Sequence, residues 1–326
     1  MLPRDTPAIF LMGATACGKT ALSLLLAKHL GAEIISVDSA LVYRGMDIGT
    51  AKPSLTEQAG ITHHLIDVCD PWESYSAARF CHDANSLIDD IHARGKRVIL
   101  VGGTMLYFKA LENGLAELPE ADPTVRQALV REAGARGWQA MHEQLAKVDP
   151  IAAARIHPND PQRLQRALEV YRITGIALSE LQLRTSSQLA VSPLKFALAP
   201  GDRVWLHKRI EQRFQAMLCD GFIDEVKILR QDKRIEATMP AIRSVGYRQA
   251  WDYLDMQQGT SVLKDALDTQ WVQKAVAATR QLAKRQLTWL RSMTNVERIE
   301  CDTLSLQEQA ELIISHITYT ETMQHD

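Results

Sequence analysis

The chain has 326 residues, of which 46% are hydrophobic and 23% are charged, and its formal net charge at pH 7 is -2. This composition predicts a globular protein with one large domain and an insertion or second domain. No apolar run approaches the roughly 20 residues of a bilayer-spanning helix, and the first residues lack the apolar core of a signal peptide. We therefore expect a cytoplasmic protein with no membrane partner. The 5 cysteines form no C-x-x-C pair and indicate neither a disulfide framework nor a zinc site.

The first motif fits G-x-x-x-x-G-K-[ST] in full and consists of Gly13, Ala14, Thr15, Ala16, Cys17, Gly18, Lys19 and Thr20. The apolar residues 8–12 predict a buried strand before it, and residues 20–30 repeat Leu and Ala at helical spacing after it. Such a loop directs backbone N–H groups and the positive end of a helix dipole at an anion, while Lys19 adds charge and the Thr20 hydroxyl can ligate Mg²⁺. We expect a diphosphate site; a glycine-rich turn with a chance lysine is the alternative.

Residues 32–37 predict a second strand that ends at Asp38 and Ser39. Ligands of open α/β sheets bind outside the carboxyl ends of the strands, so Asp38 is expected at the edge that carries the phosphate loop. There it could act as a base or orient a ligand, while a helix cap or turn former remains the equal alternative. The glycine-rich residues 43–53 follow and predict a functional loop.

A third strand is expected at residues 64–68, a helix at 75–93 and a fourth strand at 97–101. Strands that alternate with helices predict a parallel sheet, so the expected fold class is α/β, with a P-loop NTPase-like core and flanking helices. After its apolar run the fourth strand reaches Gly102, Gly103 and Thr104, where an NTPase would offer an acidic Mg²⁺ partner. The missing acid argues against γ-phosphoryl transfer, and the glycines predict close approach of a ligand to the backbone.

From residue 118 the pattern becomes wholly helical. Asp122 and Asp149 each precede a proline, which predicts a cap and a first helical residue, and residues 157–161 open a third helix. We therefore expect a small all-helical insertion at residues 122–190, between a first core part at 1–121 and a second at 191–326. The third helix carries Arg163 and Arg166 in its first turn, where the helix dipole disfavours cations, so an anion site and solvated surface arginines both remain open.

The chain returns to a strand at residues 195–199 and then to long helices. Residues 271–298 hold six Lys or Arg and one acid, Glu297. Arg280, Lys284 and Arg291 are expected on one face beside Trp289, and the core stripe is expected to comprise Val276, Ala283, Leu287 and Leu290. Such a basic helix suits a nucleic-acid backbone, although a charge-rich solvated helix is nearly as common.

These motifs together resemble those of the bacterial tRNA dimethylallyltransferases, also called tRNA isopentenyltransferases, of the IPP transferase family. The resemblance rests, in chain order, on residues 13–20, 36–39, 45–53, 101–104, 159–163, 244–248 and 279–291. It implies transfer of a dimethylallyl group from its diphosphate to the exocyclic amine of the adenosine 3′ to certain tRNA anticodons, with Mg²⁺ as cofactor. A monomer that binds the anticodon stem-loop is expected.

The resemblance also implies roles for individual residues. Residues 13–20 hold the diphosphate, Lys19 and Arg213 supply positive charge, Asp38 is the general base, Thr104 lines the reaction channel, and Thr20 binds Mg²⁺. The implied tRNA contacts are Asp38, Ser39, Ala40, Leu41, Thr104, Arg126, Gln162, Arg163, Leu164, Gln165, Arg166, Arg243, Ser244, Val245, Gly246, Tyr247, Arg248, Arg280 and Lys284. Many family members carry glutamine at the position of Ala40 and serine at that of Cys17, whose thiolate we expect to be reactive beside a lysine and a helix N-terminus.

Other classes of protein stay open. A small-molecule P-loop kinase is disfavoured by the missing acid and by the basic C-terminal helix. An adenylate isopentenyltransferase that acts on free nucleotides would not need the helical insertion with Arg163 and Arg166. A non-catalytic RNA-binding module related to GTPases would carry a guanine-recognition motif, and the sequence shows none.

Overall fold

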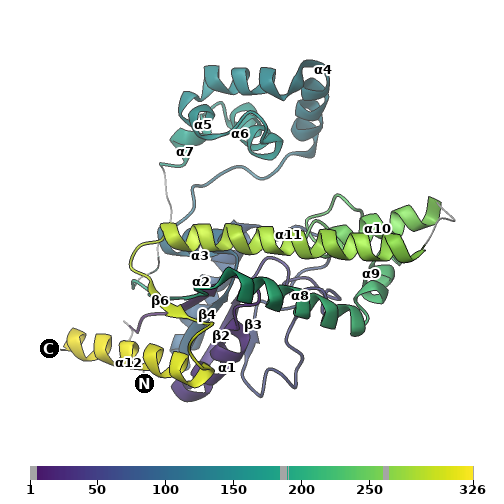
Figure 1. The fold of residues 1–326 in the computed structure, drawn as a ribbon. Coiled ribbons are helices and arrows are strands. Elements are labelled where there is room, and N and C mark those ends of the chain that lie inside the picture. Colours follow the sequence, from purple (N-terminus) through teal and green to yellow (C-terminus); the bar gives the residue numbers. More distant parts are fainter. Residues whose placement is uncertain (1–5, 184–188, 190, 260–263, 326) are drawn as a thin grey trace. The chain divides into compact units, whose positions relative to one another are not determined.

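The structure is a computed structural model that describes residues 6–183, 189, 191–259 and 264–325 (Figure 1). It divides into two compact units. Unit 1 comprises Met1–Glu112 and Leu189–Asp326, and unit 2 comprises Asn113–Gln188. No helix in the described part of the chain is long and apolar enough to cross a membrane.

Unit 1 is built on a six-stranded sheet with the order β3-β2-β4-β1-β5-β6, in which every neighbouring pair is parallel. The strands are β1 (Ile9–Gly13), β2 (Ala32–Val37), β3 (His63–His64), β4 (Arg97–Gly102), β5 (Leu194–Ala199) and β6 (Glu297–Glu300). β1 and β2 are buried along their whole length, as expected for central strands covered on both faces. The predicted α/β fold with a mostly parallel sheet is confirmed.

One predicted strand is wrong in extent. The strand expected at residues 64–68 is limited to His63–His64. Leu65 and Asp67 have φ angles of 59° and 56°, and this left-handed backbone cannot continue a strand. The chain therefore turns there, and the Asp67 carboxylate accepts a hydrogen bond of 2.5 Å from Lys52 in the preceding loop.

The two helices of unit 1 whose bounds were predicted, at residues 20–30 and 75–93, begin within two residues of those bounds and end at them. The helices of unit 1 are α1 (Lys19–Leu30), α2 (Ala77–Ala93), α3 (Met105–Asn113), α8 (Arg203–Cys219), α9 (Phe222–Gln231), α10 (Tyr247–Gly259), α11 (Lys264–Ser292) and α12 (Leu306–His325). α1 and α2 contact β4 of the sheet, and α11 contacts β1. The long helix α11 also packs along α8 and α10 (Figure 1). Two helices far along the chain, α8 and α11, thus lie close to the phosphate loop.

Unit 2 is all-helical and has its own core. Its helices are α4 (Pro123–Val148), α5 (Pro150–Arg155), α6 (Pro161–Thr174) and α7 (Leu178–Leu181). The side chains of Asp122, Asp149 and Asp160 accept hydrogen bonds from amides at the starts of α4, α5 and α6, so the predicted caps at Asp122 and Asp149 and the helix start at Pro161 are confirmed. The core contains Leu129, Met141, Leu145, Leu164, Leu168 and Val170. The division into two units does not test the boundaries expected for the insertion, residues 122–190, which stay a prediction.

Candidate active site

The phosphate loop has the geometry that its sequence predicts. β1 ends at Gly13, α1 begins at Lys19, and Gly18 between them has a φ of 94° that favours glycine. No side chain caps α1. The N–H groups of its first turn therefore remain available to an anion at the centre of the sheet's carboxyl edge.

Lys19 is held by its own loop. Its Nζ donates a hydrogen bond of 2.8 Å to the carbonyl oxygen of Ala14, and the side chain is half-buried. Burial lowers the pKa of Lys19, and the neighbouring Arg213 lowers it further, whereas Cys17 and Asp38 raise it. A bound diphosphate would add negative charge beside Nζ and so favour the charged form of Lys19.

Asp38 is both a turn former and a lining residue. Its Oδ1 accepts hydrogen bonds from the amides of Ala40, at 2.8 Å, and Leu41, at 3.4 Å. Next to it, the amide of Ser39 donates to Thr104 Oγ1 at 3.1 Å, which joins the ends of β2 and β4. The role of Asp38 as a turn former is confirmed, and the half-buried carboxylate also lines two cavities, where its role as a base or ligand orienter stays a prediction.

Two arginines of α8 reach this region. Arg213 Nη2 donates to the carbonyl oxygen of Thr50 at 3.2 Å, and one helical turn earlier Arg209 Nε donates to that of Ala16 at 2.8 Å. Burial lowers the pKa of Arg213, Asp38 raises it, and Arg209 lowers it. Arg209 was not predicted, although its spacing of four residues from Arg213 puts both on one helix face and could have indicated it.

Gln286 of α11 is a second residue that the sequence interpretation missed. Its Oε1 accepts from the Thr15 amide, and its Nε2 donates to the carbonyl oxygen of Gly103, both at 2.9 Å. A Cβ at Gly102 would collide with the carbonyl of Val37, and one at Gly103 would collide with the Gln286 side chain. Gly102, the last residue of β4, and Gly103 thus also have a packing reason; both line the smaller cavity, and the close approach of a ligand to them stays a prediction.

Two adjoining cavities of unit 1 meet at these residues. The larger has a volume of about 430 Å³ and the smaller about 110 Å³. Residues that line both are Thr15, Asp38, Thr50, Gly103, Arg213 and Gln286. The larger cavity has an extensive apolar wall, formed by Met105, Leu106, Ile210, Phe214, Met217, Val245, Tyr247, Leu282 and Trp289. The smaller is more polar and includes Lys19, Thr20, Ser23 and Ser36.

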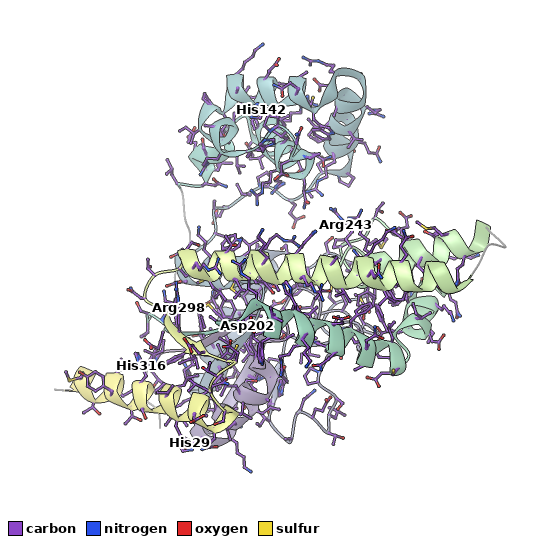
Figure 2. The ribbon with its side chains drawn as sticks, in the orientation of Figure 1. His29, His142, Asp202, Arg243, Arg298 and His316 are labelled. Carbon is purple, nitrogen blue, oxygen red and sulfur yellow. The ribbon has the colours of Figure 1, made fainter. Side chains whose placement is uncertain are left out.

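Most of the predicted tRNA contacts of unit 1 lie around these cavities. The larger one is lined by Asp38, Ser39, Ala40, Thr104, Arg243, Ser244, Val245, Gly246 and Tyr247, and the smaller one includes Leu41. Figure 2 labels Arg243 on the segment that precedes α10. Arg248 lines neither cavity and lies 4.0 Å from Asp252 on its own helix.

The basic helix α11 presents a different face from the predicted one. Arg280 pairs with Glu211 of α8 at 3.2 Å, and Lys284 is exposed outside both cavities. The lining residues from α11 are Thr279, Leu282, Arg285, Gln286 and Trp289. The expectation that Trp289 lies beside Lys284 is wrong, because five residues at about 3.6 per turn put them on different faces. The core stripe is confirmed, with Val276, Ala283 and Leu290 buried and Leu287 partly buried.

In unit 2 the predicted tRNA residues differ in environment. Arg126 Nε and Arg166 Nη1 both donate to Glu169, each at 2.8 Å, and Glu169 is fully buried. Burial raises the pKa of Glu169, but these hydrogen bonds outweigh it and lower the pKa. Arg163 is 71% exposed.

Other residues of the same stretch serve the fold of unit 2. The side-chain NH₂ of Gln165 donates to the backbone carbonyl oxygen of Arg126 at 3.1 Å. Gln162, by contrast, is exposed. The Leu164 side chain is completely buried in the unit 2 core, which corrects the prediction that this side chain contacts tRNA.

Cys17 does not have the predicted accessibility. Its side chain is 2% exposed and lines neither cavity. A hydrogen bond from Cys301 lowers the pKa of Cys17; burial opposes this, and Lys19 adds to the lowering. Burial limits the contact of the Cys17 thiol with reagents, so the predicted openness to oxidation or alkylation is not supported.

Comparisons with known proteins identify the family. The family model described as IPP transferase matches residues 41–293. A tRNA dimethylallyltransferase of Stenotrophomonas maltophilia (strain K279a) is 58% identical over 89% of this chain and 91% of its own length.

Solved structures agree. The full-length tRNA isopentenylpyrophosphate transferase of Bacillus halodurans has a TM-score of 0.70 and 35% identity, covering 98% of this chain and 100% of its own. A eukaryotic dimethylallyltransferase acting on tRNA has a TM-score of 0.77 and 28% identity, covering 96% of this chain and 79% of its own. The chain therefore belongs to the IPP transferase family.

Proposed function

We propose that this enzyme transfers a dimethylallyl group from dimethylallyl diphosphate to the exocyclic amine of the adenosine 3′ to the anticodon of tRNA. One observation carries the proposal: a phosphate loop and a carboxylate, Asp38, line a cavity with an extensive apolar wall. The relatives named as tRNA dimethylallyltransferases support the same activity.

The diphosphate is the leaving group of this reaction. As the bond to the dimethylallyl carbon breaks, negative charge grows on the diphosphate oxygens. Thr15, Lys19 and Thr20 of the phosphate loop border the smaller cavity together with Arg213, and fixed positive groups there would stabilise that charge without reorganising. Because no γ-phosphate is attacked, the reaction does not need the acidic Mg²⁺ partner that an NTPase offers after this strand and that the present sequence lacks.

Asp38 would serve the acceptor. An adenine exocyclic amine is a weak nucleophile, and a carboxylate that takes its proton during attack contributes about 10²- to 10⁴-fold. The turn hydrogen bonds from Ala40 and Leu41 fix the carboxylate at the cavity wall. Thr104, held by the Ser39 amide, borders the same cavity and would orient the base or the amine.

The apolar wall of the larger cavity suits both organic groups. Side chains such as Phe214, Leu282 and Trp289 offer surfaces on which a dimethylallyl chain and a purine face can be buried. A target base that is stacked in an anticodon loop must be flipped out before its amine can reach Asp38. Exposed Arg163 and Arg285 supply positive charge for the RNA backbone.

The donor set of the smaller cavity fits Mg²⁺. The hydroxyl of Thr20 and the carboxylate of Asp38 line it together with Ser36, whose Oγ is buried and has no hydrogen-bond partner among the described residues. Mg²⁺ prefers oxygen ligands, and it commonly keeps several waters beside one or two protein groups and substrate phosphates. When bound there, Mg²⁺ would neutralise part of the charge on the diphosphate.

The deciding experiment is single-turnover transfer from labelled dimethylallyl diphosphate to an anticodon stem-loop. The proposal expects label in the RNA, none in free AMP, and no phosphate release from ATP. Label that appears mainly in AMP would identify a nucleotide prenyltransferase. ATP hydrolysis without labelled RNA would identify a kinase-like activity and refute the proposal.

A further inference from the structure

Residues 47–49 of the irregular loop between β2 and β3 donate their backbone amides to one carboxylate of α9. Glu225 Oε2 accepts from the amides of Asp47, at 2.8 Å, and Ile48, at 2.7 Å, and its Oε1 accepts from the amide of Gly49 at 3.2 Å. Three successive N–H groups that converge on one anion fix the local backbone strongly, because charge-assisted hydrogen bonds are about twice as strong as neutral ones.

A fourth donor reaches the same carboxylate. The hydroxyl of Tyr247, at the start of α10, donates to Glu225 Oε1 at 2.5 Å. Burial and the nearby carboxylate raise the pKa of Tyr247, so the phenol keeps its proton and remains a donor. The Tyr247 ring packs so closely on the loop that a Cβ at Gly49 would lie 2.7 Å from it. Glu225 therefore joins the loop to the segment at residues 243–247, which lines the larger cavity.

The residue after these three amides touches the site. Thr50 lines both cavities, and its carbonyl oxygen accepts the 3.2 Å hydrogen bond from Arg213. Its own hydroxyl donates to the carbonyl oxygen of Met46 at 2.6 Å, which closes the loop on itself. The position of the Thr50 carbonyl, and with it the direction of the Arg213 guanidinium, thus depends on the backbone that Glu225 holds.

We propose that Glu225 is a positioning residue that aims Arg213 at the diphosphate through the loop at residues 47–50. Glu225 lines neither cavity, so it acts through other groups. The inference rests on the proposed function, because it assigns Arg213 to the diphosphate of that reaction.

Substitution by glutamine is the sharpest change. Glu225→Gln preserves the size of the side chain but exchanges one acceptor oxygen for an NH₂ donor, which would face N–H or O–H donors that have lost their partner. A partly buried donor that faces another donor loses its hydrogen bond, so the loop should shift away from Glu225. Asp224→Asn is the matched control, because this exposed carboxylate one residue earlier pairs only locally with Lys227, at 2.8 Å.

The experiment is a double-mutant cycle on the affinity for inorganic pyrophosphate, measured by calorimetry for wild type, Glu225→Gln, Arg213→Ala and the double variant. We expect each single change to weaken binding about tenfold, and the double variant to bind about as weakly as Arg213→Ala alone. The same Glu225→Gln protein should show a raised KM for dimethylallyl diphosphate, while Asp224→Asn matches wild type.

Two results would overturn the inference. One is a folded Glu225→Gln protein with unchanged pyrophosphate affinity; the other is a loss that adds fully to that of Arg213→Ala. If thermal melting shows that Glu225→Gln does not fold, Tyr247→Phe, which removes one hydrogen bond and keeps the ring, replaces it under the same two criteria. Failure of the proposed function is separate: wild type would then bind pyrophosphate but place no label in the stem-loop.

Discussion

The side-chain oxygen of Gln286 accepts a hydrogen bond of 2.9 Å from the backbone N–H of Thr15 in the phosphate loop. Through its NH₂ group, which donates to the Gly103 carbonyl, Gln286 also holds the loop after β4. One side chain of α11 therefore sets the spacing between two loops of the sheet edge. These loops carry the groups that would meet the diphosphate and the acceptor base.

Gln286→Glu should lower kcat/KM for dimethylallyl diphosphate by about tenfold or more. The variant keeps an acceptor for Thr15 but directs a carboxylate oxygen at the Gly103 carbonyl, and the loss of one hydrogen bond plus this repulsion costs about 1.5–3 kcal/mol. Steady-state kinetics with an anticodon stem-loop provides the measurement. Thr288→Ala, an exposed change on the same helix, serves as control. Wild-type kinetics in Gln286→Glu would show that the bridge has no part in turnover.

Lys19→Ala should abolish transfer while the protein still folds. The lost charge removes on the order of 3 kcal/mol or more of stabilisation from the developing diphosphate anion. Folding should weaken by only about 1 kcal/mol, because one hydrogen bond to the Ala14 carbonyl disappears. Single-turnover transfer and urea unfolding separate the two effects. Near-normal turnover at saturating substrate would contradict the role of Lys19.

Asp38→Asn should reduce the chemical step by about 10²- to 10⁴-fold and leave the Kd for dimethylallyl diphosphate nearly unchanged. Asparagine keeps an oxygen that can accept from the Ala40 amide, so the turn survives, but it cannot take a proton. Asp38→Ala removes the turn bonds as well and should also lower stability. Single-turnover rates and binding titrations test both variants. An Asp38→Asn protein that transfers at the wild-type rate would rule out a general base here.

Arg163→Ala and Arg166→Ala should behave differently despite their similar positions in the sequence. Arg163 is 71% exposed, so its loss should raise the KM for tRNA and reduce the slope of log affinity against log salt by about 0.7 to 0.9. Arg166 holds the buried Glu169, so its loss should destabilise the protein by about 1–3 kcal/mol. Salt titrations of tRNA binding and thermal melts distinguish the two. An unchanged salt slope in Arg163→Ala would mean that Arg163 does not contact a phosphate.

The stability that Glu33 supplies should disappear in acid. Glu33 is 1% exposed; its burial raises its pKa, but hydrogen bonds from Arg94, Lys96 and His64 outweigh this and lower the pKa to about 2. Because the folded pKa lies below the unfolded value of about 4.3, the contribution is complete above that value and is lost as the pH falls towards 2. We expect Glu33→Gln to lower the free energy of unfolding by about 2 kcal/mol at pH 7.

Urea unfolding of wild type and Glu33→Gln at pH 7, 5, 4 and 3 measures this dependence. The difference in unfolding free energy between the two proteins should shrink as the pH falls from 5 to 3. A difference that does not depend on pH would mean that packing, and not the charge of Glu33, is what the substitution removes.

The sequence alone determined the parts of this protein that depend on local backbone chemistry. The phosphate loop, the buried strands at its sides and the capped helices at Asp122 and Asp149 follow from residue types within a few positions of each other. The predicted strand at 64–68 failed for a local reason that periodicity does not reveal, since an apolar run does not show the left-handed backbone of Leu65 and Asp67.

Only the tertiary structure decided which side chains complete the site. Gln286 and Thr15 are 271 residues apart in the chain, and Glu225 lies 178 residues from Asp47, so no local pattern relates them. The resemblance assigned Arg126 and Arg166 to tRNA, yet both engage the buried Glu169. Arg166 is its neighbour three residues earlier on α6, whereas Arg126 comes from α4, 43 residues earlier in the chain. A sequence shows which groups are present, whereas the partners that orient and neutralise them are brought together only when α8, α9 and α11 pack beside the loops of the sheet.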